Sequence, residues 1–355
     1  MNIKDIAKLA EVGVSTVSRV LNNHPDVKES TRQKILEIIK ESNYIPNNSA
    51  RILKQNNTKN IGILVQGVFN PFFYQMTNVI GNIINENGYT MIIQQNDYNN
   101  YYQEVDTLIG FIKEKRLQGV ICLGGNFIEI TNESFKEINV PIILTSVNTV
   151  SKEGMSYYSS IGIDNVKSAY DATTYLINKG HKKISLILGE TNDMGVSLWR
   201  LEGYKKALAD NGIEVDDELI IVGGYSSRTA YKETLKLLKK RKDITAVFSL
   251  SDIMAIGAAK AILNSDLKIP EDISVIGFDG MDESEYYNPS ITTVKQPKKL
   301  MAKMSINLLM SQINGEKGNE HVLLDTELIE RDSCFDITSL TTKKFKANKE
   351  KKSKK

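Results

Sequence analysis

Cysteine and histidine are scarce in this sequence of 355 residues. The two cysteines, Cys122 and Cys334, allow no disulfide framework and form no zinc-binding spacing. The three histidines, His24, His181 and His321, lie far apart in the chain, and none belongs to a metal-ligand motif. We therefore expect neither a metal ion nor another cofactor.

Long hydrophobic runs are also missing. No stretch approaches about eighteen consecutive apolar residues, so no transmembrane helix is predicted. The first residues, MNIKDIAKLAEV, lack the apolar centre and the small-residue cleavage site of a secretory signal. We expect a cytoplasmic protein without a membrane partner.

Motifs of catalysis are absent as well. The sequence contains no G-x-S-x-G and no phosphate-binding P-loop. Gly124-Gly125 is too short for a dinucleotide fingerprint, and Asp216-Asp217 falls in a predicted exposed turn. The sequence therefore predicts a protein that is not an enzyme.

Charge is present but unevenly distributed. Residues 1–60 carry ten Lys or Arg against six Asp or Glu, and residues 343–355 carry eight lysines and one glutamate. Because the net charge of the chain is +2, the middle is acidic. Basic ends on an acidic body indicate that an end meets a polyanion. Residues 341–355 are predicted to form a disordered, lysine-rich tail.

The first residues have the periodicity of short amphipathic helices. In IKDIAKLA, Ile6, Leu9 and Ala10 share one face, which predicts a helix that buries them. Gly13 is expected to allow a tight turn and to cap the next helix. A third helix is predicted to begin at the capping box Ser30 to Gln33 and to bury Ile35, Ile38 and Ile39.

The second helix, residues 14–22, is predicted to bury Val17, Val20 and Leu21. Two short helices separated by a tight turn, with a supporting third, form a helix-turn-helix unit, although a helical cap without a partner has the same spacing. The exposed face favours DNA. Ser15 and Arg19 lie four residues apart on one side, and arginine can donate two hydrogen bonds to guanine.

The segments IKDIAKLAEVGVSTVSRVLN and TRQKILEIIKESNYIPNNSARILK resemble the headpiece of the lactose-repressor (LacI/GalR) family. The resemblance implies that Val14, Ser15 and Arg19 read bases. Thr16, by its own chemistry, can hold a phosphate. The resemblance also makes NNSARILK a hinge helix, in which Leu53 inserts into the minor groove and the small Ala50 permits close approach.

From Ile61 onward, apolar runs alternate with longer helical stretches. Strand–helix alternation predicts parallel, doubly wound sheets, and some 280 residues exceed one such sheet, so two lobes are expected. Predicted strands begin near residues 61, 90, 119, 141, 160, 184, 246 and 273, and predicted helices cover residues 72–87, 165–179, 198–211 and 252–264.

Polar and aromatic residues follow these strands, where doubly wound folds bind ligands. Aromatic rings and fixed polar groups suit a sugar. Alternatives stay open: the Phe72-Phe73 pair fits a core, Arg200 could form an interlobe ion pair, and Asp252 is expected to cap a helix. The segments GHKKISLILGE, RLEGYKKAL, SDIMAIGAAKAI, PEDISVIGFDG and PSITTVKQP resemble the same family, whose body is similar to ribose-type periplasmic binding proteins.

By that resemblance the effector contacts are Asn70, Phe72, Phe73, Arg200, Tyr225, Asp279 and Gln296, and Ser251 and Ser146 are further candidates, of which Ser146 is the weaker. Ser251 stands where the family usually has asparagine, so the ligand stays open. The expected domains are a headpiece (1–46), a hinge helix and linker (47–60), an effector domain (61–340) and the tail. Lobe one takes about 61–161 and 291–321, and lobe two about 162–290 and 322–340.

The resemblance implies a homodimeric repressor of carbohydrate-utilisation genes that binds a pseudo-palindromic operator in double-stranded DNA. A sugar or sugar phosphate between the lobes would control its operator affinity. The alternative is a catabolite-control-type regulator whose coregulator is a phosphorylated carrier protein. A pure sugar-binding module is disfavoured by the headpiece. The sequence leaves the sugar and the direction of its effect open.

Overall fold

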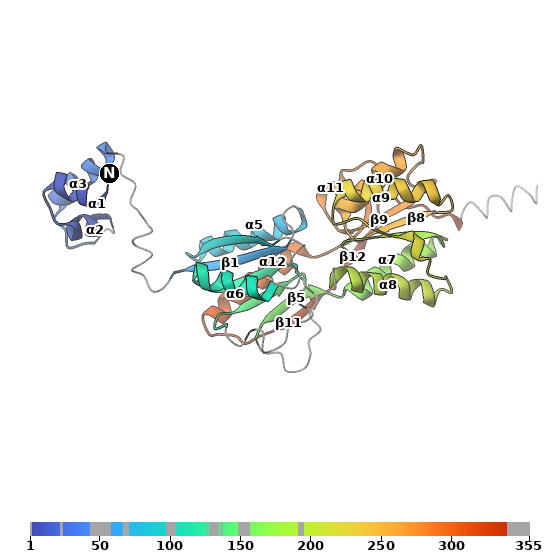
Figure 1. Cartoon of the computed structure of the whole chain (residues 1–355). Coiled ribbons are helices and arrows are strands. Elements are labelled where there is room, and N and C mark those ends of the chain that lie inside the picture. The colour runs from blue at the N-terminus through green and yellow to red at the C-terminus, as the bar shows by residue number, and fades with distance from the viewer. Residues whose placement is uncertain are drawn as a thin grey trace, which may run out of the picture. The chain divides into compact units, whose positions relative to one another are not determined.

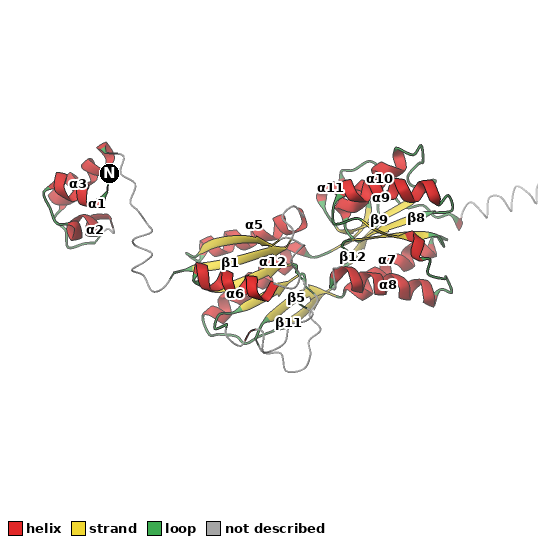
Figure 2. Cartoon of the chain, viewed as in Figure 1, coloured by secondary structure: helices red, strands yellow, loops and turns green. Residues whose placement is uncertain are grey.

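The structure is a computed structural model of the chain (Figures 1 and 2). It describes residues 2–21, 24–42, 58–66, 71–96, 104–125, 127, 135, 138–147, 157–190 and 195–338. The chain divides after residue 58 into two compact units. Among the described helices, none is both long and apolar enough to cross a membrane.

The first unit, the headpiece, contains the three predicted helices. They are α1 (Ile3–Ala10), α2 (Val14–Leu21) and α3 (Glu29–Glu41). One small core joins them, built from one face of each helix and consisting of Ile6, Ala7, Ala10, Val17, Val20 and Ile35. The prediction of an inward Leu9 was wrong, because Leu9 is 53% exposed and Ala7 is buried in its place.

The caps of these helices differ from the predicted ones. The capping box belongs to α1, where the Asn2 side chain accepts from the backbone of Asp5 and the Asp5 carboxylate accepts from the Asn2 N–H at 2.8 Å. No box forms at Ser30, because α3 begins one residue earlier, at Glu29. The left-handed residue between α1 and α2 is Glu11 (φ 57°), not Gly13. Gly13 does begin α2, since its carbonyl accepts from the Val17 N–H at 3.2 Å.

The second unit, the body, begins with a six-stranded sheet that we call lobe one together with its helices. The strand order is β11-β5-β4-β3-β1-β2, and every neighbouring pair is parallel. The strands are β1 (Asn60–Gln66), β2 (Thr90–Asn96), β3 (Leu117–Leu123), β4 (Ile142–Thr145), β5 (Ser159–Ile163) and β11 (His321–Leu324), and the helices are α5 (Pro71–Glu86), α6 (Glu104–Lys115) and α12 (Lys298–Ile313).

Strand β1 shows why this sheet is covered on both faces. Its alternate residues Ile61, Ile63 and Val65 belong to the core that contains the buried face of α5. Leu64 points the other way, into a second core with Phe111 of α6. Figure 1 accordingly shows α5 and α6 on opposite sides of β1. Both faces are apolar, as expected for a doubly wound sheet.

Lobe two is a second six-stranded sheet with its own helices, in the order β12-β10-β9-β8-β6-β7. Figure 1 shows α9 and α10 over one face and α7 and α8 over the other. Its strands are β6 (Ile184–Leu188), β7 (Ile220–Val222), β8 (Ala246–Ser249), β9 (Ser274–Asp279), β10 (Thr292–Lys295) and β12 (Glu327–Ile329). Its helices are α7 (Asn165–Asn178), α8 (Val196–Asp210), the 3-10 turn η3 (Asp217–Leu219), α9 (Ser227–Lys240), α10 (Asp252–Leu263) and α11 (Asp282–Glu285).

The chain passes between the two sheets three times, and two of these crossings differ from the expected boundaries. Residues 292–295 were assigned to lobe one, but β10 pairs with β9 and β12 of lobe two. Residues 322–324 were assigned to lobe two, but β11 pairs with β5 of lobe one. The edge strand β12 is antiparallel to β10, so lobe two is not purely parallel as predicted. The expected hinge helix and most of its linker (47–57) and the expected tail (341–355) lie outside the described part of the chain.

In both sheets the strand order reverses beside the first strand, because β1 lies between β2 and β3 and β6 lies between β7 and β8. Where the order reverses, the connections from two neighbouring strands leave toward opposite faces, which opens a crevice at the carboxyl ends of those strands. In lobe one that edge follows Gln66 and Leu123, and in lobe two it follows Leu188 and Ser249. We therefore expect a ligand-binding site at these four strand ends.

Close packing of α7 on α8 yields a stability prediction. A Cβ on Gly203 would lie 2.2 Å from the Val166 carbonyl oxygen and 2.9 Å from the Tyr170 nitrogen. Gly203→Ala should therefore lower the free energy of unfolding by at least about 1–3 kcal/mol, measured by urea titration. Gly110→Ala is the matched control, because its Cβ meets nothing within 4 Å, and it should stabilise the chain by about 0.5–1 kcal/mol. Equal effects of the two changes would contradict this account of the helix contact.

Candidate functional site

The outer face of α2 carries the residues predicted to read DNA. Val14 is 41% exposed, Ser15 and Arg19 are exposed, and Thr16 is half-buried. The helix is only eight residues long, and Val17 and Val20 fix it to the headpiece core. The structure thus places the polar face outward without any basic or acidic side chain in its first turn. Ala50 and Leu53 lie outside the described residues.

Arg200 is the central cation at the carboxyl end of lobe two, and it is 3% exposed. Its Nε donates to Asn165 Oδ1 at 2.9 Å, and an Nη donates to the carbonyl of Leu250 at 2.6 Å. Its guanidinium lies 3.6 Å from the centroid of the Phe278 ring. These three partners all belong to lobe two, so they hold the arginine within that lobe.

Asp279 lies at the end of β9, where it is 4% exposed and has a φ of 114°. Its Oδ1 accepts a hydrogen bond of 2.8 Å from Gln296 Nε2. Burial raises the pKa of the Asp279 carboxyl to about 7, although the nearby Arg200 charge opposes that rise. The buried Oε1 of Gln296 has no hydrogen-bond partner. Three predicted contact residues therefore form one buried polar group with an unused acceptor.

Asp252 was expected to cap α10, and this was wrong. The cap is Ser251, whose hydroxyl accepts from the Met254 N–H at 3.4 Å. The Asp252 carboxylate instead accepts from the Met281 N–H at 2.6 Å, the Ser284 hydroxyl at 2.9 Å and the Thr293 hydroxyl at 2.6 Å. Burial raises its pKa to about 6. Asp252 thus ties β10 to the turn that follows Asp279, while Ser251 is itself 1% exposed.

Tyr225 follows β7 in a left-handed conformation, with a φ of 48°. Its hydroxyl is 3.0 Å from that of Ser197 on α8. The ring packs against Gly189, because a Cβ there would lie 2.1 Å from the ring. The aromatic ring predicted as a platform is therefore fixed beside the carboxyl end of β6.

In lobe one the two predicted phenylalanines are packed against one another. Phe72 and Phe73 are 2% and 7% exposed, and their rings meet edge to face at 5.1 Å. Both belong to the main hydrophobic core of the body, which the sequence had left open as their alternative role. Ser146 is half-buried after β4, in a left-handed conformation. Asn70 lies outside the described residues.

Gln66, which the sequence analysis did not single out, ends β1 beside these residues. It is 5% exposed, and its Nε2 donor has no hydrogen-bond partner. A Cβ on Gly124 would lie 2.7 Å from Phe73 and 3.3 Å from the Cβ of Gln66, so the three residues are neighbours. The available signal was a glutamine at the end of the apolar strand NIGILVQ.

Lys298, the first residue of α12, connects the two lobes. Its ammonium donates to the Gly280 carbonyl at 2.7 Å in lobe two and lies 6.0 Å from the centroid of the Phe72 ring in lobe one. Burial lowers its pKa, opposed by the charges of Asp279 and Asp252. A second contact joins Gln75 of α5 to Asp282 of α11 at 3.4 Å.

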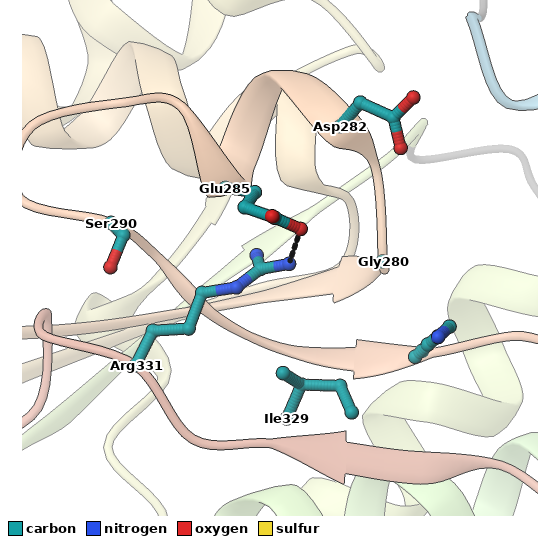
Figure 3. Close-up of a pocket in the computed structure, with 7 residues that line it drawn as sticks. Gly280, Asp282, Glu285, Ser290, Ile329 and Arg331 are labelled. Carbon is teal, nitrogen blue, oxygen red and sulfur yellow. Dashed lines mark hydrogen bonds and ion pairs between the residues drawn. The ribbon is translucent and has the colours of Figure 1, made fainter.

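A separate cavity of about 410 Å³ lies on lobe two (Figure 3). In Figure 3 Arg331 extends toward Glu285, and the two side chains pair at 3.1 Å. No predicted effector residue lines this cavity, which is bounded by Gly280, Asp282, Glu285, Ser290, Lys295, Ile329 and Arg331. Within the described residues, no group of three or more His, Cys, Asp or Glu side chains could hold a metal.

Comparison with known proteins identifies the chain. Residues 2–47 match the family of bacterial regulatory proteins called the lacI family, and residues 173–334 match the periplasmic binding protein-like domain. The regulator MalR of Clostridium butyricum is 71% identical over 337 residues, which cover 95% of this chain and all of that protein. This chain belongs to the LacI family. The predicted family is therefore confirmed, and this LacI-family chain is a transcriptional regulator.

Solved LacI-family structures confirm the predicted fold class. The complex of the regulator CelR with cellobiose is 29% identical, with a TM-score of 0.68 over 94% of this chain and 99% of the other. The lac repressor dimer bound to operator and the anti-inducer ONPF is 25% identical, with a TM-score of 0.71 over the same shares. The repressor PurR of Vibrio atlanticus is 33% identical over 93% of this chain and 97% of that protein. These LacI-family relatives act as regulators, which is a non-enzymatic role.

The raised pKa of Asp279 gives a prediction for this LacI-family chain. In the unfolded state the carboxyl ionises near pH 3.9, whereas in the fold it ionises near pH 7. Between these values ionisation favours the unfolded state, so the contribution of Asp279 to the free energy of unfolding falls as pH rises, by at most about 1.4 kcal/mol per unit. Asp279→Asn should remove that slope, measured by urea titration from pH 4 to 7. Asp266→Asn is the exposed control. If the two variants and the wild type gave parallel profiles, the burial of the charge would not govern its ionisation.

Proposed function

We propose that this LacI-family regulator represses carbohydrate-utilisation genes, and that a small sugar bound between its lobes controls its affinity for an operator. The observation that carries the proposal is the buried group of Arg200, Asp279 and Gln296 at the strand ends of lobe two. Such a group combines a cation, a carboxylate and an amide acceptor that is still unused.

Sugar hydroxyls suit this group because each hydroxyl both donates and accepts. A hydroxyl can donate to Asp279 or to Gln296 Oε1 and accept from an arginine N–H. Gln66 would add a donor from lobe one, and the ring of Tyr225 an apolar face. Two solved relatives carry sugars, CelR with cellobiose and an Enterococcus faecium LacI-family regulator with ribose, the latter 28% identical with a TM-score of 0.66 over 78% of this chain and 99% of that one.

DNA recognition is assigned to the outer face of α2, with Val14, Ser15 and Arg19 at base edges and Thr16 near phosphates. A helix of eight residues reads only a short half-site, so two copies are needed for a specific operator. We therefore propose a homodimer on a pseudo-palindromic operator, in the cytoplasm. Ala50 and Leu53 keep their proposed roles in the minor groove, and the lysine-rich tail adds non-specific attraction to phosphate.

The proposed control is a population shift between two lobe arrangements. A sugar that contacts both strand-end groups favours one arrangement, and the Lys298 and Gln75 contacts are those that such a shift would rearrange. The catabolite-control alternative has less support, because a carrier protein would leave the buried polar group without a use. The mechanism fits a sugar that lowers the affinity for the operator and equally one that raises it.

The role of Arg19 can be tested with a labelled two-fold-symmetric duplex from upstream of the gene. Arg19→Ala should remove about 1–3 kcal/mol of discrimination between this operator and a scrambled duplex for each half-site, measured by fluorescence anisotropy at fixed salt. Lys40→Ala, which removes one exposed charge from α3, should weaken both duplexes alike. Undiminished discrimination by Arg19→Ala would contradict the assignment.

The role of Asp279 can be tested with the same duplex and a panel of free and phosphorylated sugars. Asp279→Ala should abolish the change in operator affinity that one sugar causes in the wild type, because the hydroxyl acceptor is lost. Operator affinity without sugar should stay as in the wild type, which also shows that the variant is folded. A normal sugar response would move the site away from Asp279.

A further inference from the structure

The loop between α2 and α3 places a carboxylate on the guanidinium of Arg19. Asp26 Oδ2 lies 3.2 Å from an Nη of Arg19, which forms an ion pair. The other carboxylate oxygen, Oδ1, lies 2.6 Å from Nδ1 of His24. Three side chains are thus linked in series on the surface of the headpiece.

This series is anchored by the backbone of α2 and by a side chain of α3. The His24 N–H donates to the carbonyl of Arg19 at 2.9 Å, which fixes the start of the loop to α2. The guanidinium of Arg32, on α3, donates to the carbonyl of His24. Arg32 is itself paired with Glu29 at 3.6 Å. The carboxylate of Asp26 is therefore held in position from both helices.

Stability does not account for this arrangement. The side chains of Arg19, Asp26 and His24 are 58%, 46% and 54% exposed, and exposed ion pairs contribute little to folding. A carboxylate beside a DNA-binding face also repels phosphates, which lowers affinity for any duplex. An acid at this place is thus unfavourable for general binding, and its use must lie in what it does to Arg19.

An arginine side chain that is held before binding loses less freedom when it meets a base. Asp26 engages one Nη of Arg19 and leaves the other Nη and Nε, which together form a two-donor edge of the kind that guanine accepts. We propose that Asp26, oriented by His24, is a positioning residue that presents Arg19 to guanine and thereby sets specificity at one base pair. This inference rests on the proposed base-reading role of Arg19.

The test uses the full chain and a duplex library with a randomised centre, selected by wild-type protein. Bound and unbound fractions are sequenced for the wild type and each variant, which gives a base preference at every position. Arg19→Ala defines the position that Arg19 reads. Asp26→Asn should weaken the guanine preference at that position by about threefold to tenfold and leave the other positions unchanged. General affinity should stay the same or rise, because a negative charge is removed.

Two further variants separate position from charge. Asp26→Glu keeps the charge but moves it, so it should restore part of the preference. Glu37→Gln removes one exposed acid from α3 and should leave every base preference unchanged. Thermal unfolding of each variant should match the wild type, since these side chains are exposed.

The outcomes distinguish the inference from the function on which it rests. If Arg19→Ala removes a guanine preference while Asp26→Asn keeps it in full, the positioning role is overturned and the role of Arg19 remains. If Asp26→Asn sharpens the preference, Asp26 withholds Arg19 from the base, which also overturns the proposal. If Arg19→Ala changes no position, the proposed base-reading role fails, and the positioning role fails with it.

Discussion

Two carboxylates buried at the carboxyl end of the lobe-two sheet, Asp252 and Asp279, constrain the geometry of the site. A charge removed from water must be compensated by donors or by protonation. Asp252 accepts from three donors: one on β10, one on α11 and one in the turn between β9 and α11. Asp279 accepts a hydrogen bond from Gln296, and the charge of Arg200 favours its ionised form. Because these partners come from separate segments, the two acids fix the ends of β8, β9 and β10 relative to one another, and the polar group that we assign to the sugar follows from that.

The same constraint extends toward lobe one through a single side chain. Lys298 is the first residue after the crossing at Gln296-Pro297, and its ammonium lies in the field of both buried acids. It reaches the carbonyl of Gly280 on one lobe and the ring of Phe72 on the other. Lys298 therefore lies beside the buried polar group of lobe two and contacts both lobes.

Much of the fold could be predicted from the sequence, because apolar runs of four to seven residues mark buried strands whatever their partners. The segments IGILV and ISVIGF are examples, and both are strands. Thr292–Lys295 could be located but not assigned to a lobe, since its pairing with β9 and β12 depends on residues far away in the chain. Leu9 had the helical spacing of a core residue, yet a headpiece of three short helices has too little interior for it. For the candidate site, the sequence predicted which polar and aromatic residues follow the strands, but not which of them contact one another. The three donors of Asp252 and the unused amide of Gln66 depend on how the strands align in the fold.

The last crossing of the chain has a consequence for synthesis. Strand β11 adds an edge to the sheet of lobe one and β12 adds an edge to that of lobe two, and both come from residues 321–329. Shortly afterwards Ser333 donates to the carbonyl of Val275, and the carbonyl of Phe335 lies 3.1 Å from His181 Nε2. In a nascent chain that has not reached this segment, β5 and β10, whose residues are almost all buried in the complete fold, are the edge strands of the two sheets, and such edges invite pairing with other chains. Both lobes are thus completed by the same short stretch, and we expect a product that ends before it to aggregate.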